Sequence, residues 1–151
     1  MVSLLERLMR KISVAPFTQL GLSSPCWEWT GAADRFGHGR GKLDGRNCHV
    51  RRAIFAARGV PLRPDQHVIA LCCNSRCVND DHLVVGTADE VRAFDRFGHV
   101  GIGDLLLAKQ LIEDGEMTAD YIAFCWGISE ALLVNAMARC WWEGRFLQKA
   151  S

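Results

Sequence analysis

The chain has 151 residues, 49% of them hydrophobic, and a formal net charge of +1 at pH 7. This size and composition are typical of a folded protein with one core, or of one small domain plus an appended module, and they exclude a disordered chain. Seven cysteines without a signal peptide favour a reducing cytoplasm, where thiols stay free or bind metal. No apolar run approaches the length of a membrane span, so we expect no membrane partner.

The near-zero net charge hides two segments of opposite sign. Residues 35–63 contain a single acid, Asp44, and the basic residues Arg35, Arg40, Lys42, Arg46, Arg51, Arg52, Arg58 and Arg63. Residues 80–130 are predominantly acidic. A basic segment beside an acidic one predicts a local surface that faces phosphates, and the alternative is a charged face that contacts only solvent.

The first third of the chain predicts short elements. Apolar residues recur at helical spacing over 3–14, which predicts an amphipathic helix. Residues 26–29 are typical of the start of a strand, and Asp44-Gly45 is a strong signal for a two-residue hairpin turn. We therefore expect a β-hairpin or short sheet over about 26–50. A helix over 51–58 should follow it and stop at Gly59.

The middle of the chain predicts two strands, over 68–71 and 83–85, and a helix over 88–97 that begins with acids. Glycines at 98, 101 and 103 then mark the clearest boundary in the sequence. Beyond them the pattern is wholly helical from Asp104 to about Phe146. We expect two domains, 1–97 and 98–151, and an α+β fold class.

The C-terminal segment has the sequence pattern of a helix-turn-helix, with Gly127-Ile128-Ser129 at the turn. Its last helix offers only Glu130, Asn135 and Arg139 for bonds to base edges. Its apolar residues suit a core or a protein contact equally well. Two roles therefore stay open: reading DNA, or docking to a second copy or to RNA polymerase through a helix that includes Trp141, Trp142 and Phe146.

The loop from Cys72 to His82 has the spacing of a metal site. Cys72, Cys77 and His82 form the pattern C-x4-C-x4-H, which is long enough to bring two thiolates and an imidazole to one tetrahedral zinc. The fourth ligand must come from elsewhere, and we favour Cys26 over Cys48 and Cys73. Buried free thiols are the alternative, since cysteine also behaves as a small hydrophobe.

Several short motifs in one order resemble a known family. They are Cys26-Trp27-Glu28-Trp29-Thr30-Gly31, Gly37-His38-Gly39-Arg40, Arg51-Arg52-Ala53-Ile54-Phe55, Cys72-x4-Cys77-Val78-Asn79-x2-His82-Leu83 and Gly86-Thr87. Over residues 20–97 the chain resembles the zinc-containing HNH, or His-Me finger, endonucleases of phages and homing elements, in which a trailing helix-turn-helix is frequent. The resemblance implies a ββα-metal core stapled by structural zinc through Cys26, Cys72, Cys77 and His82, sitting on duplex DNA in a bacterial host cytoplasm.

Catalysis in that family needs an imidazole to deprotonate water and a side chain to hold a divalent ion. The resemblance places the base at Ala70 and the metal ligand at Val91, and neither residue has the required chemistry. The family's His-Arg pair is here Arg51-Arg52. The catalytic positions are therefore degenerate, and losing the base alone typically slows the reaction by about 10²- to 10⁴-fold.

The sequence is compatible with three functions. The first is a DNA-binding protein that has lost catalysis and regulates transcription in a phage or prophage, with phosphate contacts from Arg35, Arg40, Lys42, Arg46, Arg51 and Arg52. The second is a magnesium-dependent HNH nuclease, inactivated at Ala70 by nature or by engineering. The third is a protein-interaction module that binds RNA polymerase or a second copy of itself.

Overall fold

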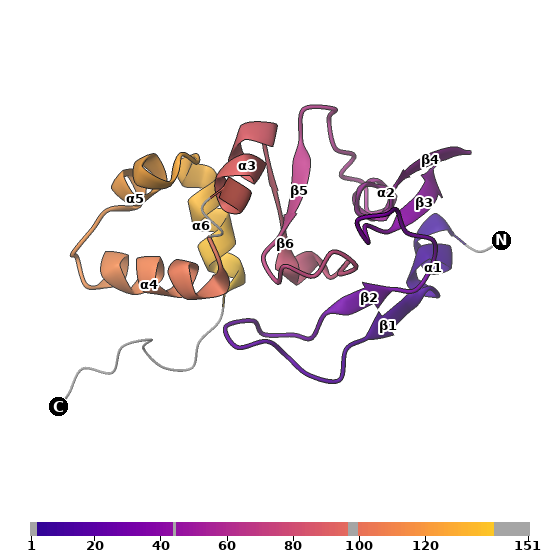
Figure 1. Ribbon diagram of the computed structural model, residues 1–151, viewed down its shortest axis with the longest axis horizontal. Coiled ribbons are helices and arrows are strands. Elements are labelled where there is room, and N and C mark those ends of the chain that lie inside the picture. The colour runs from indigo at the N-terminus through magenta and orange to yellow at the C-terminus, as the bar shows by residue number, and fades with distance from the viewer. Residues whose placement is uncertain (1–2, 44, 97–99, 141–151) are drawn as a thin grey trace.

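A computed structural model describes residues 3–43, 45–96 and 100–140, which form a mixed α+β structure of short two-stranded sheets and helices. The expected α+β class is thus confirmed. Figure 1 shows helices α4, α5 and α6 at one end of the molecule and strands β3 and β4, with α1 and α2, at the other. Strands β5 and β6 lie between the two ends.

The N-terminal segment splits into a helix and a strand. Helix α1 spans Leu4–Met9 and begins with a capping box between Ser3 and Glu6. Strand β1, Ile12–Val14, pairs antiparallel with β2, Trp27–Trp29. The prediction of one helix over 3–14 was therefore wrong at its end, because the β-branched residues of β1 gain a partner strand that is distant in sequence.

The predicted hairpin is confirmed. Strands β3, Arg40–Leu43, and β4, Arg46–His49, pair antiparallel, and Gly45 at their turn has a φ of +78°. These strands form a sheet of their own, separate from β1 and β2. Helix α2, Val50–Ala57, follows β4 without a loop and buries its apolar face against Leu8 and Trp29.

The central part has the order strand, strand, helix. Strand β5, His67–Ala70, pairs antiparallel with β6, Leu83–Gly86, and helix α3, Ala88–Arg96, follows. The loop between the strands contains three of the four predicted metal ligands, Cys72, Cys77 and His82, and ends in a short 3-10 turn, Asp80–His82. The loop therefore connects the strands at one end of this two-stranded ribbon, and α3 follows from the other end.

The C-terminal part is helical as predicted. Helices α4, Ile102–Glu113, α5, Ala119–Trp126, and α6, Glu130–Arg139, follow one another, with Gly127 left-handed between the last two. The Ser129 hydroxyl accepts a bond from the Leu132 N–H and caps α6. Among the described residues, no single helix is long and apolar enough to span a membrane; α5 and α6 pass that test only together, across a bend of 103°.

The largest hydrophobic core crosses the predicted domain boundary. It joins side chains of β5, β6 and α3 to side chains of α4, α5 and α6, including Ile69, Val84, Phe94, Leu105, Leu132 and Leu133. A bond from Arg139 Nη1 to the Asp80 carbonyl, 2.6 Å long, reinforces this contact. The helical part is therefore packed onto the β5–β6 ribbon rather than tethered beside it.

Candidate metal centre

Two segments that are distant in the sequence meet at the loop between β5 and β6, residues 71–82, which we call the metal loop. The backbone N–H of Trp29 donates to the Arg76 carbonyl, and that of Val78 donates to the Trp27 carbonyl, both at 2.8 Å. These bonds pair strand β2 with the loop, and they bring Cys26, just before β2, to Cys72, Cys77 and His82. The pairing explains how a cysteine 46 positions before Cys72 reaches the same site.

The four side chains expected to share an ion form one buried cluster. The ligand atoms of Cys26, Cys72, Cys77 and His82 all lie within 4.8 Å of one another, and each residue is at most 5% exposed. The His82 Nδ1 atom lies 3.4 Å from Cys77 Sγ and 3.6 Å from Cys26 Sγ. Zinc–sulfur and zinc–nitrogen bonds at tetrahedral angles would separate such atoms by about 3.6 Å. The cluster could therefore hold one tetrahedral metal ion.

His82 is oriented for this role. Its Nε2 atom lies 2.8 Å from the Ser24 carbonyl oxygen, which can only accept a hydrogen bond. Nε2 must therefore carry the proton, and the lone pair of Nδ1 points at the sulfurs. A backbone carbonyl that fixes the tautomer in this way is a common outer contact of metal-binding histidines.

Asn79 ties the two segments together, and sequence reasoning gave it no role. Its side-chain amide is 2% exposed and donates to the Ser24 hydroxyl and the Pro25 carbonyl, while its oxygen accepts from the Asp81 N–H. It thus caps the 3-10 turn that carries His82 and also positions the residues before Cys26. Its position two residues after Cys77 is the feature of the sequence that could have suggested this role.

The thiols are electrostatically coupled. A hydrogen bond from the Cys72 thiol lowers the pKa of Cys77 to about 4, and the same bond raises the pKa of Cys72. Burial and the charge on Cys77 raise the pKa of Cys26. The protein alone therefore favours one thiolate in the cluster, whereas a bound divalent cation favours ionisation of all three sulfurs.

Arg51 lies beside the loop and not on an open surface. Its Nε donates to the Cys77 carbonyl at 2.8 Å, and its Nη2 donates to the carbonyls of Asn74 and Ser75 at 2.8 and 3.2 Å. These bonds hold the loop in its turn. Most of the Arg51 donors therefore serve the loop, and its expected contact with a DNA phosphate stays a prediction.

The two other cysteines considered as a fourth ligand lie elsewhere. Cys48 is in β4 and packs against the core around Trp29. Cys73 is exposed and adopts a left-handed φ of +57°, which turns the backbone just after Cys72. Neither belongs to the cluster of four.

A cavity of about 600 Å³ adjoins the loop. Ala70 on β5 and Val91 on α3, the two positions where the resemblance expects catalytic groups, both line it. Its other lining residues include His38, His49, His67, Arg51, Arg52, Asn74 and Ser75. Sequence reasoning did not anticipate that residues from the β3–β4 segment would face the same cavity as Ala70 and Val91.

Glu90, which precedes Val91, is held by hydrogen bonds at both carboxylate oxygens. One of its carboxylate oxygens accepts from the Thr87 N–H, and the other accepts from both the N–H and the hydroxyl of Ser129. Burial alone would raise the pKa of Glu90, but these bonds outweigh it and lower the pKa. The carboxylate therefore links α3 to α6.

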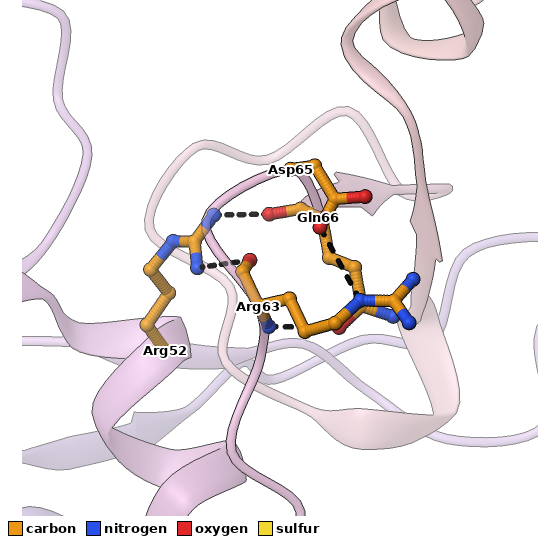
Figure 2. A network of polar contacts seen from close by, with 4 residues as sticks. All are labelled: Arg52, Arg63, Asp65 and Gln66. Carbon is orange, nitrogen blue, oxygen red and sulfur yellow. Dashed lines mark hydrogen bonds and ion pairs between the residues drawn. The ribbon is translucent and has the colours of Figure 1, made fainter.

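Arg52 is also held by backbone groups. Figure 2 shows its guanidinium donating to the carbonyls of Arg63 and Gln66, in the segment before β5, where Arg63 also pairs with Asp65. The remaining expected phosphate ligands lie on or just before the hairpin. Arg35, Lys42 and Arg46 are exposed there, and Arg40 is half-buried. The open basic surface is thus the hairpin rather than α2.

The last described helix offers little to a DNA base. Glu130 and Asn135 are exposed, but Arg139 is bound to the Asp80 carbonyl. Trp141, Trp142 and Phe146, named as a possible docking surface, lie outside the described residues. Reading of DNA by this helix therefore stays a hypothesis.

Comparison with known proteins finds two relatives in Escherichia phage T7. The chain is 26% identical to Protein 7.7 over 125 residues, covering 78% of this chain and 96% of that protein. It is 29% identical to Protein 2.8 over 90 residues, covering 59% of this chain and 57% of that protein. No family model and no solved structure matches. The chain is thus a distant homologue of small phage T7 proteins whose names state no activity.

Proposed function

We propose that the protein is a non-catalytic DNA-binding protein on a zinc-stapled, HNH-like scaffold. One observation carries the proposal: Ala70 and Val91 lie on the wall of the same cavity, beside a strand-strand-helix unit with a Cys3His cluster. An HNH nuclease would need a proton acceptor and a metal ligand at these two positions. A methyl group and an isopropyl group supply neither.

Zinc is the ion that the cluster's donors fit best. Three sulfurs and one imidazole form a closed set of four ligands, which is typical of structural zinc and leaves no position for substrate or water. The buried cluster offers no carboxylate oxygens of the kind that magnesium or calcium prefers. Its proposed role is to fix the loop between β5 and β6 against β2.

The proposed DNA contact is the β3–β4 hairpin and the cavity behind it. The hairpin carries exposed Lys42 and Arg46, and such charges bind phosphates irrespective of sequence. Binding without cutting suits regulation of transcription in a phage-infected bacterial cytoplasm, and the similarity to phage T7 proteins supports that setting. Contact with RNA polymerase or a second copy stays a secondary hypothesis.

Replacing Arg46 with glutamine is expected to weaken binding to a random-sequence duplex and to lower its salt dependence. Loss of one phosphate contact reduces the slope of log affinity against log salt by about one. Fluorescence anisotropy at several salt concentrations measures both quantities. Lys109→Gln on α4 removes the same charge at the opposite end of the molecule and should change neither (Figure 1). Equal effects of the two variants would contradict the proposed surface.

Incubation with supercoiled plasmid and magnesium is expected to give no nicking. Ala70→His should give none either, because Val91 still offers no ligand atom for the ion. Gel electrophoresis of the plasmid checks both proteins, with zinc content measured to show that each is folded. Magnesium-dependent nicking by Ala70→His alone would instead support the interpretation as a nuclease inactivated at one position.

A further inference from the structure

Helix α5 is apolar on two faces, one buried and one exposed. Ile122 and Ala123 are buried in the largest core. Tyr121 and Phe124 are three positions apart, which places them on one side of the helix, and they are 55% and 82% exposed. Met117, just before the helix, is 42% exposed. Single exposed apolar residues are ordinary, whereas a group of them on one face marks a contact surface.

The surroundings of this exposed face are acidic. Glu113 at the end of α4, Glu116 in the turn that follows and Asp120 in the first turn of α5 are all exposed. Over residues 100–140 the sequence has six acids and two bases, a formal net charge of −4. Such a surface repels a DNA backbone and favours a basic protein surface.

A basic surface of this kind lies at the other end of the same molecule. The β3–β4 hairpin carries exposed Lys42 and Arg46, and Arg35 is exposed in the loop before it. The guanidinium carbon of Arg35 lies 4.7 Å from the centroid of the Phe36 ring, and Phe36 is 65% exposed. Both ends of the molecule therefore combine an exposed aromatic ring with exposed charges, and the charges have opposite signs.

We propose that the exposed face of α5, formed by Met117, Tyr121 and Phe124, binds the β3–β4 hairpin of a second copy of this chain. Figure 1 shows α5 and the hairpin at opposite ends of the long axis, so the two surfaces do not meet within one chain. The contact is therefore head to tail, and each added copy leaves one surface of each kind open to the next copy.

Charge argues against a symmetric contact between the α5 faces of two copies. Such a contact would bring two acidic surroundings together, and like charges across an interface weaken binding. The head-to-tail contact instead places acids opposite Arg35, Lys42 and Arg46, and it covers Tyr121 and Phe124. Buried aromatic residues supply much of the binding free energy of many interfaces, while the charges around them select the partner and its orientation.

This partner is the second copy that the proposed function leaves as a secondary hypothesis, here with a defined contact surface. Its binding does not depend on DNA binding. DNA at the hairpin would compete with the partner copy for the same charges, so the tests use the protein without DNA. Their failure would leave the proposed DNA contact standing.

Sedimentation velocity of the purified protein over a range of concentrations measures the association. At low salt we expect the average mass to rise continuously with concentration and to exceed that of a dimer, because a head-to-tail contact does not close. Raising the salt from about 50 to about 500 mM should lower the association constant about tenfold, because it shortens the Debye length to a few ångströms. A protein that stays monomeric at low salt up to about 100 µM would overturn the proposal and leave the α5 face to a different partner.

Two variants, each with one damaged surface, test the head-to-tail arrangement. Phe124→Ala removes the aromatic anchor of the α5 face, and Lys42→Glu/Arg46→Glu reverses the charge of the hairpin. Each variant alone should associate about 30-fold more weakly than the wild type, as loss of a central interface residue does. An equimolar mixture should form a dimer and no larger species, because the intact hairpin of one variant meets the intact α5 face of the other.

Phe17→Ala is the matched control, because Phe17 is 64% exposed in the loop between β1 and β2 and belongs to neither surface. It should associate like the wild type. Circular dichroism and zinc content check that every variant is folded. Unchanged association of either damaged variant, or a mixture that stays monomeric, would overturn the proposal. A symmetric α5 dimer would be recognised by its persistence in the hairpin variant and its loss in Phe124→Ala, without rescue in the mixture.

Discussion

Replacing Cys77 with serine is expected to unfold the part of the protein that surrounds the metal loop. Cys77 is fully buried, its thiolate is the most favoured of the three, and its backbone joins the loop to β2. The binding free energy of a structural zinc is folding free energy and commonly reaches about 10–16 kcal/mol, comparable to or larger than the roughly 5–15 kcal/mol that stabilises a whole domain. Loss of a ligand should therefore remove most of this contribution.

The measurements are zinc content, circular dichroism and thermal unfolding. We expect the variant to lose stoichiometric zinc and, for a loss of about 5 kcal/mol or more, a Tm at least roughly 10 °C lower than that of the wild type. A strong chelator should have the same effect on the wild-type protein. Cys125→Ser is the matched control, because Cys125 is an exposed cysteine on α5 and its loss should change neither quantity. A metal-free protein with unchanged stability would refute the zinc assignment.

The sequence predicted the local elements better than their ends and partners. The hairpin signal at Asp44-Gly45 and the cap at Ser129 act over a few residues, and both were confirmed. The helix predicted over 3–14 failed after Met9, because Ile12 pairs with Trp29, and such long-range pairing leaves no local pattern. The core shared by β5 and α4–α6 was missed for the same reason, because contacts between residues distant in sequence leave no local pattern.

For the candidate site too, the sequence predicted the residues that lie close together in the chain and missed contacts between distant residues. The spacing of Cys72, Cys77 and His82 was sufficient to predict three members of the cluster, since they lie in one loop. Cys26 was favoured as the fourth ligand over Cys48 and Cys73, although no local spacing connects it to the loop. The roles of Arg51 and Asn79 could not be predicted, because they depend on carbonyl groups of distant residues. Charge alone suggested that Arg51 faces DNA, whereas most of its donors face the protein.

Replacing Arg51 with methionine is expected to lower both stability and metal affinity. Three thiolates around a divalent cation leave one net negative charge in a buried site, and Arg51 lies beside it. Methionine keeps an apolar side chain as long as the arginine stem but removes the charge and the donors to three loop carbonyls. Removing one partner of a buried ionic arrangement typically costs about 3–5 kcal/mol, and losing a group that supports metal ligands typically lowers affinity about 10- to 100-fold.

Competition with a coloured chelator measures the zinc affinity, and denaturant unfolding of the zinc-loaded protein measures the stability. Arg51→Lys separates the two causes, because it keeps the positive charge without the planar fork that reaches several carbonyls. Arg51→Lys should restore most of the zinc affinity that Arg51→Met loses. It should restore a smaller share of the lost stability. Arg52→Met is the matched control: it removes a neighbouring arginine that also bonds to carbonyls, but those carbonyls lie outside the metal loop. Equal zinc affinities in Arg51→Met and Arg52→Met would show that the position of the charge beside the thiolates is unimportant.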